Sequence, residues 1–142
     1  VIVKGVIGAE DALLAVEAGA DAVVVSNHGA RYLDSGQSSL ELLPEIVDTV
    51  GGSAQVFFDG GIRSGADVAK ALALGANLTC VGRPVCWGLA DGSNGVREIF
   101  SEIRTDLERI MVFLGKEQVS ELDRGVLAPA SFDRLLDFVG PS

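Results

Sequence analysis

An internal repeat is the feature that most constrains the fold of this chain. The segment 11–21, which ends in Gly19-Ala20-Asp21, recurs as 67–77, which ends in Gly75-Ala76-Asn77, at a constant offset of 56 residues. An apolar run follows each copy. Two βα units of about 28 residues each fit this offset, and their repetition is typical of parallel strands joined by right-handed crossovers.

The apolar patterns predict four strands and four longer helices. We expect a buried strand at 1–3 and further strands at 22–25, 55–59 and 78–81, with helices at 10–18, about 40–50, 64–74 and 96–114, and a loop at 91–95. Four βα units are half of an eight-stranded barrel, because a complete (β/α)8 TIM barrel needs about 250 residues. The sequence therefore predicts an α/β fold of about four βα units.

The charge balance excludes one class of partner. Eleven basic and twenty acidic residues give a net charge of −9, which argues against a nucleic-acid surface, since phosphate contacts need clustered Lys and Arg. We see neither a membrane-span pattern nor a signal peptide. The chain opens on an apolar strand pattern without an initiating methionine, so we expect a fragment or a processed chain.

The two cysteines, Cys80 and Cys86, form a C-x5-C pair with no second pair and no supporting histidine. We expect them to be reduced and structural in an intracellular protein; a disulfide or a metal site is the alternative.

The stretch from Ser26 to Arg31 is the strongest candidate for chemistry. It follows the apolar run 22–25 and contains His28, the only histidine in the chain. A neutral-pH proton acceptor and a fixed cation at a strand end point to a catalytic base beside an anion clamp, Arg31. The alternatives are a histidine hydrogen-bonded in the core and an arginine in a surface salt bridge.

Two glycine-rich turns follow the third and fourth predicted strands, at 59–64 and 82–84. Glycine lets backbone amides approach an anion, and Arg63 and Arg83 supply charged donors, so the pair predicts a phosphate site. Ordinary turn chemistry is the alternative. Lys4, at the end of the first strand, is equally consistent with a solvated lysine.

Together these motifs resemble a known family, the FMN-dependent 2-hydroxy acid oxidases and dehydrogenases, and in particular its glycolate oxidase-like members. The resemblance extends to about residue 114 and implies that the chain is the C-terminal half of a TIM barrel. It rests on Lys4-Gly5, Ser26-Asn27-His28-Gly29-Ala30-Arg31, Leu33-Asp34, Asp59-Gly60-Gly61-Ile62-Arg63, 70–76 and Gly82-Arg83-Pro84.

The resemblance also implies residue roles. His28 would take a proton from the substrate as hydride equivalents pass to flavin N5, and Arg31 would bind the substrate carboxylate. Lys4 would stabilise the reduced flavin near N1, and Ser26 would hydrogen-bond the isoalloxazine edge. Asp59 would meet the ribityl chain, and the remaining cofactor-binding positions, several of them on the phosphate, would be Gly60, Gly61, Ile62, Arg63, Gly82 and Arg83.

On this basis we expect FMN-dependent oxidation of a small (S)-2-hydroxy acid to the 2-oxo acid, with O2 as oxidant and H2O2 as product. The alternatives are a dehydrogenase that passes electrons to a quinone or cytochrome, and a non-catalytic half-barrel that binds FMN or phosphate. The expected partners are the N-terminal half of the barrel and further copies in a homo-oligomer, a tetramer by resemblance.

The remaining expectations concern the domain bounds, the location in the cell and the residues that differ from the family. Residues 1–142 would form one half-barrel domain with 116–142 as its tail. We expect an intracellular protein, cytoplasmic or peroxisomal, although the C-terminus carries no peroxisomal signal. Tyr32 departs from the family, whose members usually have glutamine there, and Trp87 is expected to pack in the core or at an interface.

Overall fold

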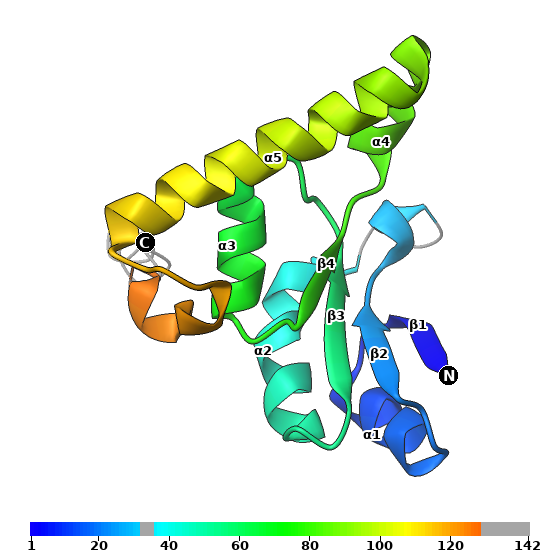
Figure 1. Ribbon diagram of the computed structural model, residues 1–142. Coiled ribbons are helices and arrows are strands. Elements are labelled where there is room, and N and C mark those ends of the chain that lie inside the picture. Colours follow the sequence, from blue (N-terminus) through cyan, green and yellow to red (C-terminus); the bar gives the residue numbers. More distant parts are fainter. Residues whose placement is uncertain (32–35, 129–142) are drawn as a thin grey trace, which may run out of the picture.

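A parallel sheet of four strands, paired in chain order, forms the centre of the fold. The computed structural model describes residues 1–31 and 36–128; Tyr32, the Leu33-Asp34 part of the motif and the end of the tail lie outside them. The strands are β1 (Ile2–Val6), β2 (Ala22–Val25), β3 (Gln55–Asp59) and β4 (Leu78–Cys80). Figure 1 shows them side by side, and the predicted α/β class with a parallel sheet is confirmed.

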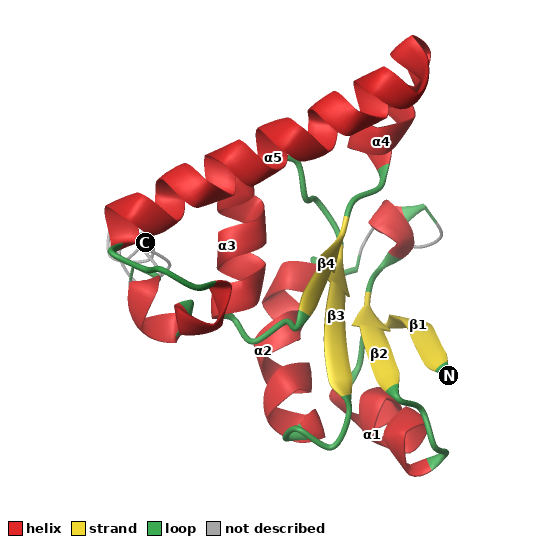
Figure 2. Cartoon of the chain, in the orientation of Figure 1, coloured by secondary structure: helices red, strands yellow, loops and turns green. Residues whose placement is uncertain are grey.

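Three helices pack against this sheet and two more lie beyond them. α1 contacts β1 and β2, α2 contacts β2 and β3, and α3 contacts β4. α5 crosses both α3 and α4, as Figure 2 shows. The helices are α1 (Ala9–Glu17), α2 (Ser39–Val50), α3 (Gly65–Ala73), α4 (Arg83–Gly88) and α5 (Gly92–Leu114), with short 3-10 turns at His28–Ala30, Leu89–Asp91, Val119–Glu121 and Arg124–Val126.

The structure reproduces the sequence repeat. α1 and α3 begin at residues 9 and 65 and end at residues 17 and 73, and β2 and β4 begin at residues 22 and 78. Each pair differs by the predicted 56 residues, so the repeated unit is a helix followed by a strand.

Side-chain caps fix where two of the helices begin. The Ser64 hydroxyl accepts a hydrogen bond from the Asp67 backbone N–H at 3.3 Å, and Ser64 and Asp67 together form a capping box. Ser38 and Glu41 form a second capping box, so α2 begins at Ser39 and continues through Pro44. A side-chain oxygen at this position satisfies an N–H that the first turn leaves without an intrahelical partner.

The loop predicted at 91–95 is wrong, because Gly92 to Gly95 form the first turn of α5. Glycine is needed there for close helix contact: a Cβ on Gly95 would lie 2.1 Å from the carbonyl oxygen of Gly88 in α4. Likewise, Gly82-Arg83-Pro84 is not only a turn, since Arg83 begins α4 and Pro84 occupies its first turn, where no N–H is required.

The buried strand predicted at 1–3 is also wrong in its length and its burial. β1 extends to Val6, and Ile2 is 58% exposed. Within the described sheet β1 is an edge strand that pairs only with β2. Trp87 is exposed on α4 rather than packed in the core of this chain. Within residues 1–31 and 36–128, we find no helix that combines the length and the apolar character needed to cross a bilayer.

We predict that Gly65→Ala destabilises the fold where α3 crosses α5. A Cβ on Gly65 would lie 2.0 Å from the Leu107 backbone nitrogen, so the helices must separate, at a cost of about 1–3 kcal/mol. Urea denaturation of the variant and of the unchanged chain measures the difference in their free energies of unfolding. The matched control, Ala66→Gly in the same turn, removes a methyl group and should cost about 1 kcal/mol or less; a larger loss for the control would contradict this view of the crossing.

Candidate active site

The carboxyl ends of the four parallel strands surround a cavity of about 360 Å³. In a parallel α/β sheet this edge is where ligands bind. All the residues singled out from the sequence, except Ser26, contribute to its wall. They are Lys4, His28, Arg31, Asp59, Gly60, Gly61, Ile62, Arg63, Gly82 and Arg83.

Lys4 and Asp59 form an ion pair across the sheet. The same Asp59 oxygen accepts a hydrogen bond of 2.9 Å from the hydroxyl of Ser26, and Lys4 Nζ donates to that hydroxyl at 3.2 Å. Ser26 itself is only 1% exposed. Lys4 is therefore held in place by two partners, which speaks against the simple solvated lysine.

The His28 loop has an unusual backbone. His28, Gly29 and Ala30 all have positive φ, at 56°, 68° and 59°. Outside glycine this conformation is uncommon and strained, and it persists only where surrounding contacts impose it. Two such contacts are the bonds from the backbone N–H of His28 to Ser26 Oγ (3.2 Å) and of Gly29 to Asn27 Oδ1 (3.0 Å).

The loop presents its side chains to the cavity. His28 and Arg31 are both exposed and line the same space. The alternative of a histidine buried in the core is therefore wrong, and His28 and Arg31 lie at one opening. Their roles as base and anion clamp stay predictions. A Cβ on Gly29 would lie 3.5 Å from Nη2 of Arg83, so the side chain of this first residue of α4 reaches the loop.

The two predicted phosphate turns meet in the cavity, but their donors differ from the expectation. The backbone N–H groups of Arg63 and Ser64 both donate to the Asp67 carboxylate at 3.0 Å. These two amides are therefore occupied, and the exposed guanidinium groups of Arg63 and Arg83 are the charged donors that the two turns offer to an anion.

The wall of the cavity is strongly cationic. Four of its side chains are Lys or Arg, and Asp59 is the only acidic one among the described residues that line it. A chain with a net charge of −9 thus concentrates positive charge at one strand edge. Such a local field favours an anionic ligand regardless of the overall charge.

Comparison with known proteins agrees with this geometry. The model of the FMN-dependent dehydrogenase family matches residues 1–129. The chain belongs to this family.

Relatives that match the chain are oxidases of 2-hydroxy acids by name. An L-lactate oxidase of Nostoc sp. is 48% identical over 127 residues, which are 89% of this chain and 35% of the relative. Human 2-hydroxyacid oxidase 1 is 43% identical over 125 residues, 87% of this chain and 34% of the relative. The chain thus spans about a third of the length of these relatives.

Solved structures give the same result. The crystal structure of mandelate oxidase with benzoyl-formic acid has a TM-score of 0.83 and 47% identity over 87% of this chain and 37% of that one. A variant of mandelate oxidase, solved with a monooxide FMN adduct, matches with the same score and identity and 40% coverage.

Two residues of the cavity wall were not predicted from the sequence to belong to the site. Cys80, at the end of β4, and Cys86, on α4, both line it and are free thiols. The assignment as reduced cysteines stands, but Cys86 is exposed in the wall rather than structural. For Cys80 the sequence held one signal, its position at the carboxyl end of the fourth predicted strand. In the structure Cys80 pairs there with Asp59 of β3.

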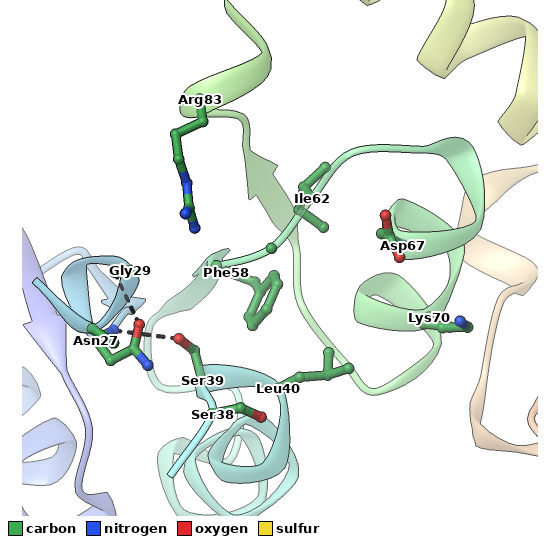
Figure 3. A pocket seen from close by; sticks show the side chains of 13 residues that line it. Asn27, Gly29, Ser38, Ser39, Leu40, Phe58, Ile62, Asp67, Lys70 and Arg83 are labelled. Atoms are coloured by element: carbon green, nitrogen blue, oxygen red, sulfur yellow. Dashed lines mark hydrogen bonds between the residues drawn. The ribbon is translucent and has the colours of Figure 1, made fainter. Parts of the chain in front are cut away.

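A second cavity of about 380 Å³ adjoins the first, between the His28 loop, the start of α2 and the β3 loop. In Figure 3, Arg83 extends from α4 toward Gly29, and Asn27 is tied to Ser39. Gly29, Gly60, Gly61, Ile62 and Arg83 belong to both cavities.

Burial raises the pKa of the Cys80 thiol, and the negative charge of Asp59 adds to this effect while Lys4 opposes it. The thiolate, which is the reactive form, is therefore scarcer at a given pH. We predict that in Cys86→Ser the remaining Cys80 reacts with iodoacetamide at pH 7–8 more slowly than a free cysteine of pKa about 8.5.

The rate for Cys80 should also keep increasing with pH above the range of the free thiol. In the control, Cys80→Ser, the exposed Cys86 should react faster than Cys80 does. Equal rates for the two variants would show that the environment of Cys80 does not suppress its thiolate.

Proposed function

We propose that this chain is the C-terminal half of an FMN-dependent (β/α)8 barrel that oxidises a small (S)-2-hydroxy acid to the 2-oxo acid, with O2 as oxidant and H2O2 as product. The observation that carries the proposal is the single cavity that contains His28, Arg31 and Lys4 together with Arg63 and Arg83. The names of the family and of the relatives support the reaction class.

The residues present fit FMN. Its phosphate needs charged donors, and Arg63 and Arg83 supply them without an opposing carboxylate in the cavity other than Asp59. Three glycines of the wall, Gly60, Gly61 and Gly82, leave the backbone open to a ligand. When bound, FMN supplies the two-electron acceptor that the reaction requires.

The residues of the chain itself supply orientation and proton transfer. Arg31 binds the substrate carboxylate, and a bidentate guanidinium contact fixes which carbon is presented. An imidazole nitrogen of His28 accepts the proton that leaves the substrate, because the ring nitrogen that carries no hydrogen in neutral imidazole is a proton acceptor. Lys4 places a positive charge where negative charge develops, and Asp59 and Ser26 orient it.

The rest of the barrel is the partner that this proposal requires. The described sheet ends at β1 and β4, whose outer edges have no neighbouring strand within residues 1–31 and 36–128. Parallel sheets are normally closed or covered, so we infer that an N-terminal half completes residues 1–142, in which 116–142 form the tail. Homo-oligomer formation, and a cytoplasmic or peroxisomal location, remain predictions from the sequence.

The same cavity is also compatible with two other functions. A dehydrogenase that passes electrons to a quinone or cytochrome would use the same residues, and one relative from Schizosaccharomyces pombe is named an FMN-dependent alpha-hydroxy acid dehydrogenase. A non-catalytic half-barrel would bind FMN or phosphate alone.

We predict that the chain binds FMN more tightly than riboflavin, because only FMN carries the phosphate. Arg63→Met and Arg83→Met should each weaken FMN binding about 10- to 100-fold, as expected for losing a charge-assisted hydrogen bond, and leave riboflavin binding unchanged. Flavin fluorescence titration measures both. Arg97→Met on α5, whose side chain bonds Asn94, is the control. Equal affinity for the two flavins would contradict the phosphate site.

We predict that His28→Ala keeps the flavin but loses its reduction by substrate. The test joins the N-terminal part of the Nostoc L-lactate oxidase to this chain and follows flavin absorbance after anaerobic addition of glycolate, lactate or mandelate. Loss of the base should slow bleaching about 10²- to 10⁴-fold.

The same joined protein with His28 unchanged distinguishes the proposed oxidase from the two alternatives. Flavin bands that no 2-hydroxy acid bleaches would favour the binding module, and bleaching without rapid reoxidation by O2 would favour the dehydrogenase. Full residual reduction in His28→Ala would refute the role assigned to the histidine.

A further inference from the structure

β1 carries one extra residue just before it reaches the site. Lys4 pairs with Val24 of β2. The next residue of β2, Val25, pairs with Val6, so that Gly5 lies between two paired positions of β1. Gly5 is therefore a β-bulge, and its φ of 96° is a backbone conformation that glycine adopts without the strain of a side chain.

Neither the apolar core nor Lys4 needs this extra residue. Val24 and Val25 are successive residues of a regular strand, so they and their partners point to opposite faces of the sheet. Val6 accordingly packs in the core cluster with Val25, and Lys4 lines the cavity. A regular strand without Gly5 would form the same two pairs and give both side chains the same directions.

The surroundings of Gly5 point to the histidine instead. A Cβ on Gly5 would lie 3.6 Å from Cε1 and 3.7 Å from Nδ1 of His28. Within residues 1–31 and 36–128, and apart from the neighbours of Gly5 in the chain, these two are the only heavy atoms within 4 Å of that position. Gly5 therefore faces one edge of the imidazole and leaves room there for a methyl group but for no larger side chain.

The imidazole lies between two cavities. A third cavity, of about 270 Å³, is lined by Gly5, Asn27 and Gln37 among others. Of the described residues, His28 alone lines both this cavity and the one that contains Lys4. A base must present its ring to the space that holds the substrate. Gly5 limits the room for the ring on the other side.

We propose that Gly5 is a positioning residue for His28: the bulge brings backbone without a side chain against the imidazole and holds the ring toward the cavity that contains Lys4 and Arg31. The inference rests on the proposed function, because that function makes His28 the base. β-Bulges are frequent next to active sites, where they aim a side chain. Here the side chain that is aimed belongs to the neighbouring loop.

Gly5→Ala tests the proposal, and Gly19→Ala is the matched control. Gly19 has nearly the same φ, 94°, but no heavy atom of the described residues lies within 4 Å of the place that its Cβ would take, chain neighbours aside. Both variants force alanine into left-handed backbone and should lose a similar amount of stability in urea. Only Gly5→Ala changes the surface that the imidazole contacts.

The single histidine makes the contact measurable on the 142-residue chain. Labelling with [13C]histidine gives one ring Cε1–H signal, which belongs to His28. In the unchanged chain this proton should show a nuclear Overhauser contact to an α-proton of Gly5. The signal should move in Gly5→Ala and stay in place in Gly19→Ala. A missing contact, or the same signal position in both variants, would overturn the proposal.

Flavin reduction measures the consequence for the reaction. In the protein joined to the N-terminal part of the Nostoc L-lactate oxidase, Gly5→Ala should slow anaerobic bleaching at saturating substrate about 10- to 100-fold, as expected for a slightly misplaced base. The half-saturating substrate concentration should change little, because the base acts in the transition state. Gly19→Ala should keep the original rate, and equal rates for the two variants would overturn the proposal.

Deletion of Gly5 keeps the test decisive if Gly5→Ala does not fold. The deletion retains the pairs that Lys4 and Val6 form with β2, so the chain should fold with a regular β1. Flavin reduction should slow as in Gly5→Ala, and an unchanged rate would overturn the proposal. If no 2-hydroxy acid reduces the joined protein even without a substitution, the proposed function fails, and the ring signal still decides whether Gly5 positions His28.

Discussion

The in-register pairing of the parallel strands is the constraint on which the site depends. Val25 pairs with Phe58, so the next residues of the two strands, Ser26 and Asp59, come side by side, and Asp59 in turn pairs with Cys80. A shift of one residue would exchange inward and outward side chains along a whole strand. Val56 and Phe58, which are buried while their neighbours in β3 are not, oppose such a shift, so the apolar core also sets the polar site.

The site concentrates charge that the whole chain does not suggest. Net charge describes the average surface, whereas the residues at one strand edge are selected by topology: every βα loop begins there. Each of the four units contributes a cation, namely Lys4, Arg31, Arg63 and Arg83. A strongly acidic protein can for this reason attract anions to one place and repel them elsewhere.

Much of this arrangement could be predicted from the sequence, because local signals and the fold agree. The repeat gave the spacing of α1 and α3, and the glycine-rich turns with the lone histidine gave the cavity wall. The predictions failed where tertiary contacts decide. Gly95 looks like a loop residue, yet α5 needs a small residue there against Gly88 of α4. The hydrogen bonds of the Ser26 hydroxyl join it to Lys4 on β1 and Asp59 on β3, 22 and 33 residues away, and no local pattern contains these partners.

The positive φ angles of His28 and Ala30 lower the stability of the loop backbone and, in exchange, hold the imidazole in its position. Left-handed backbone is unfavourable for both residue types, so the loop would relax if it were free. The loop conformation is therefore stabilised by hydrogen bonds to the side chains of Ser26 and Asn27, which directly follow β2. A substitution that let this loop relax would therefore stabilise the backbone and at the same time displace the imidazole from the cavity.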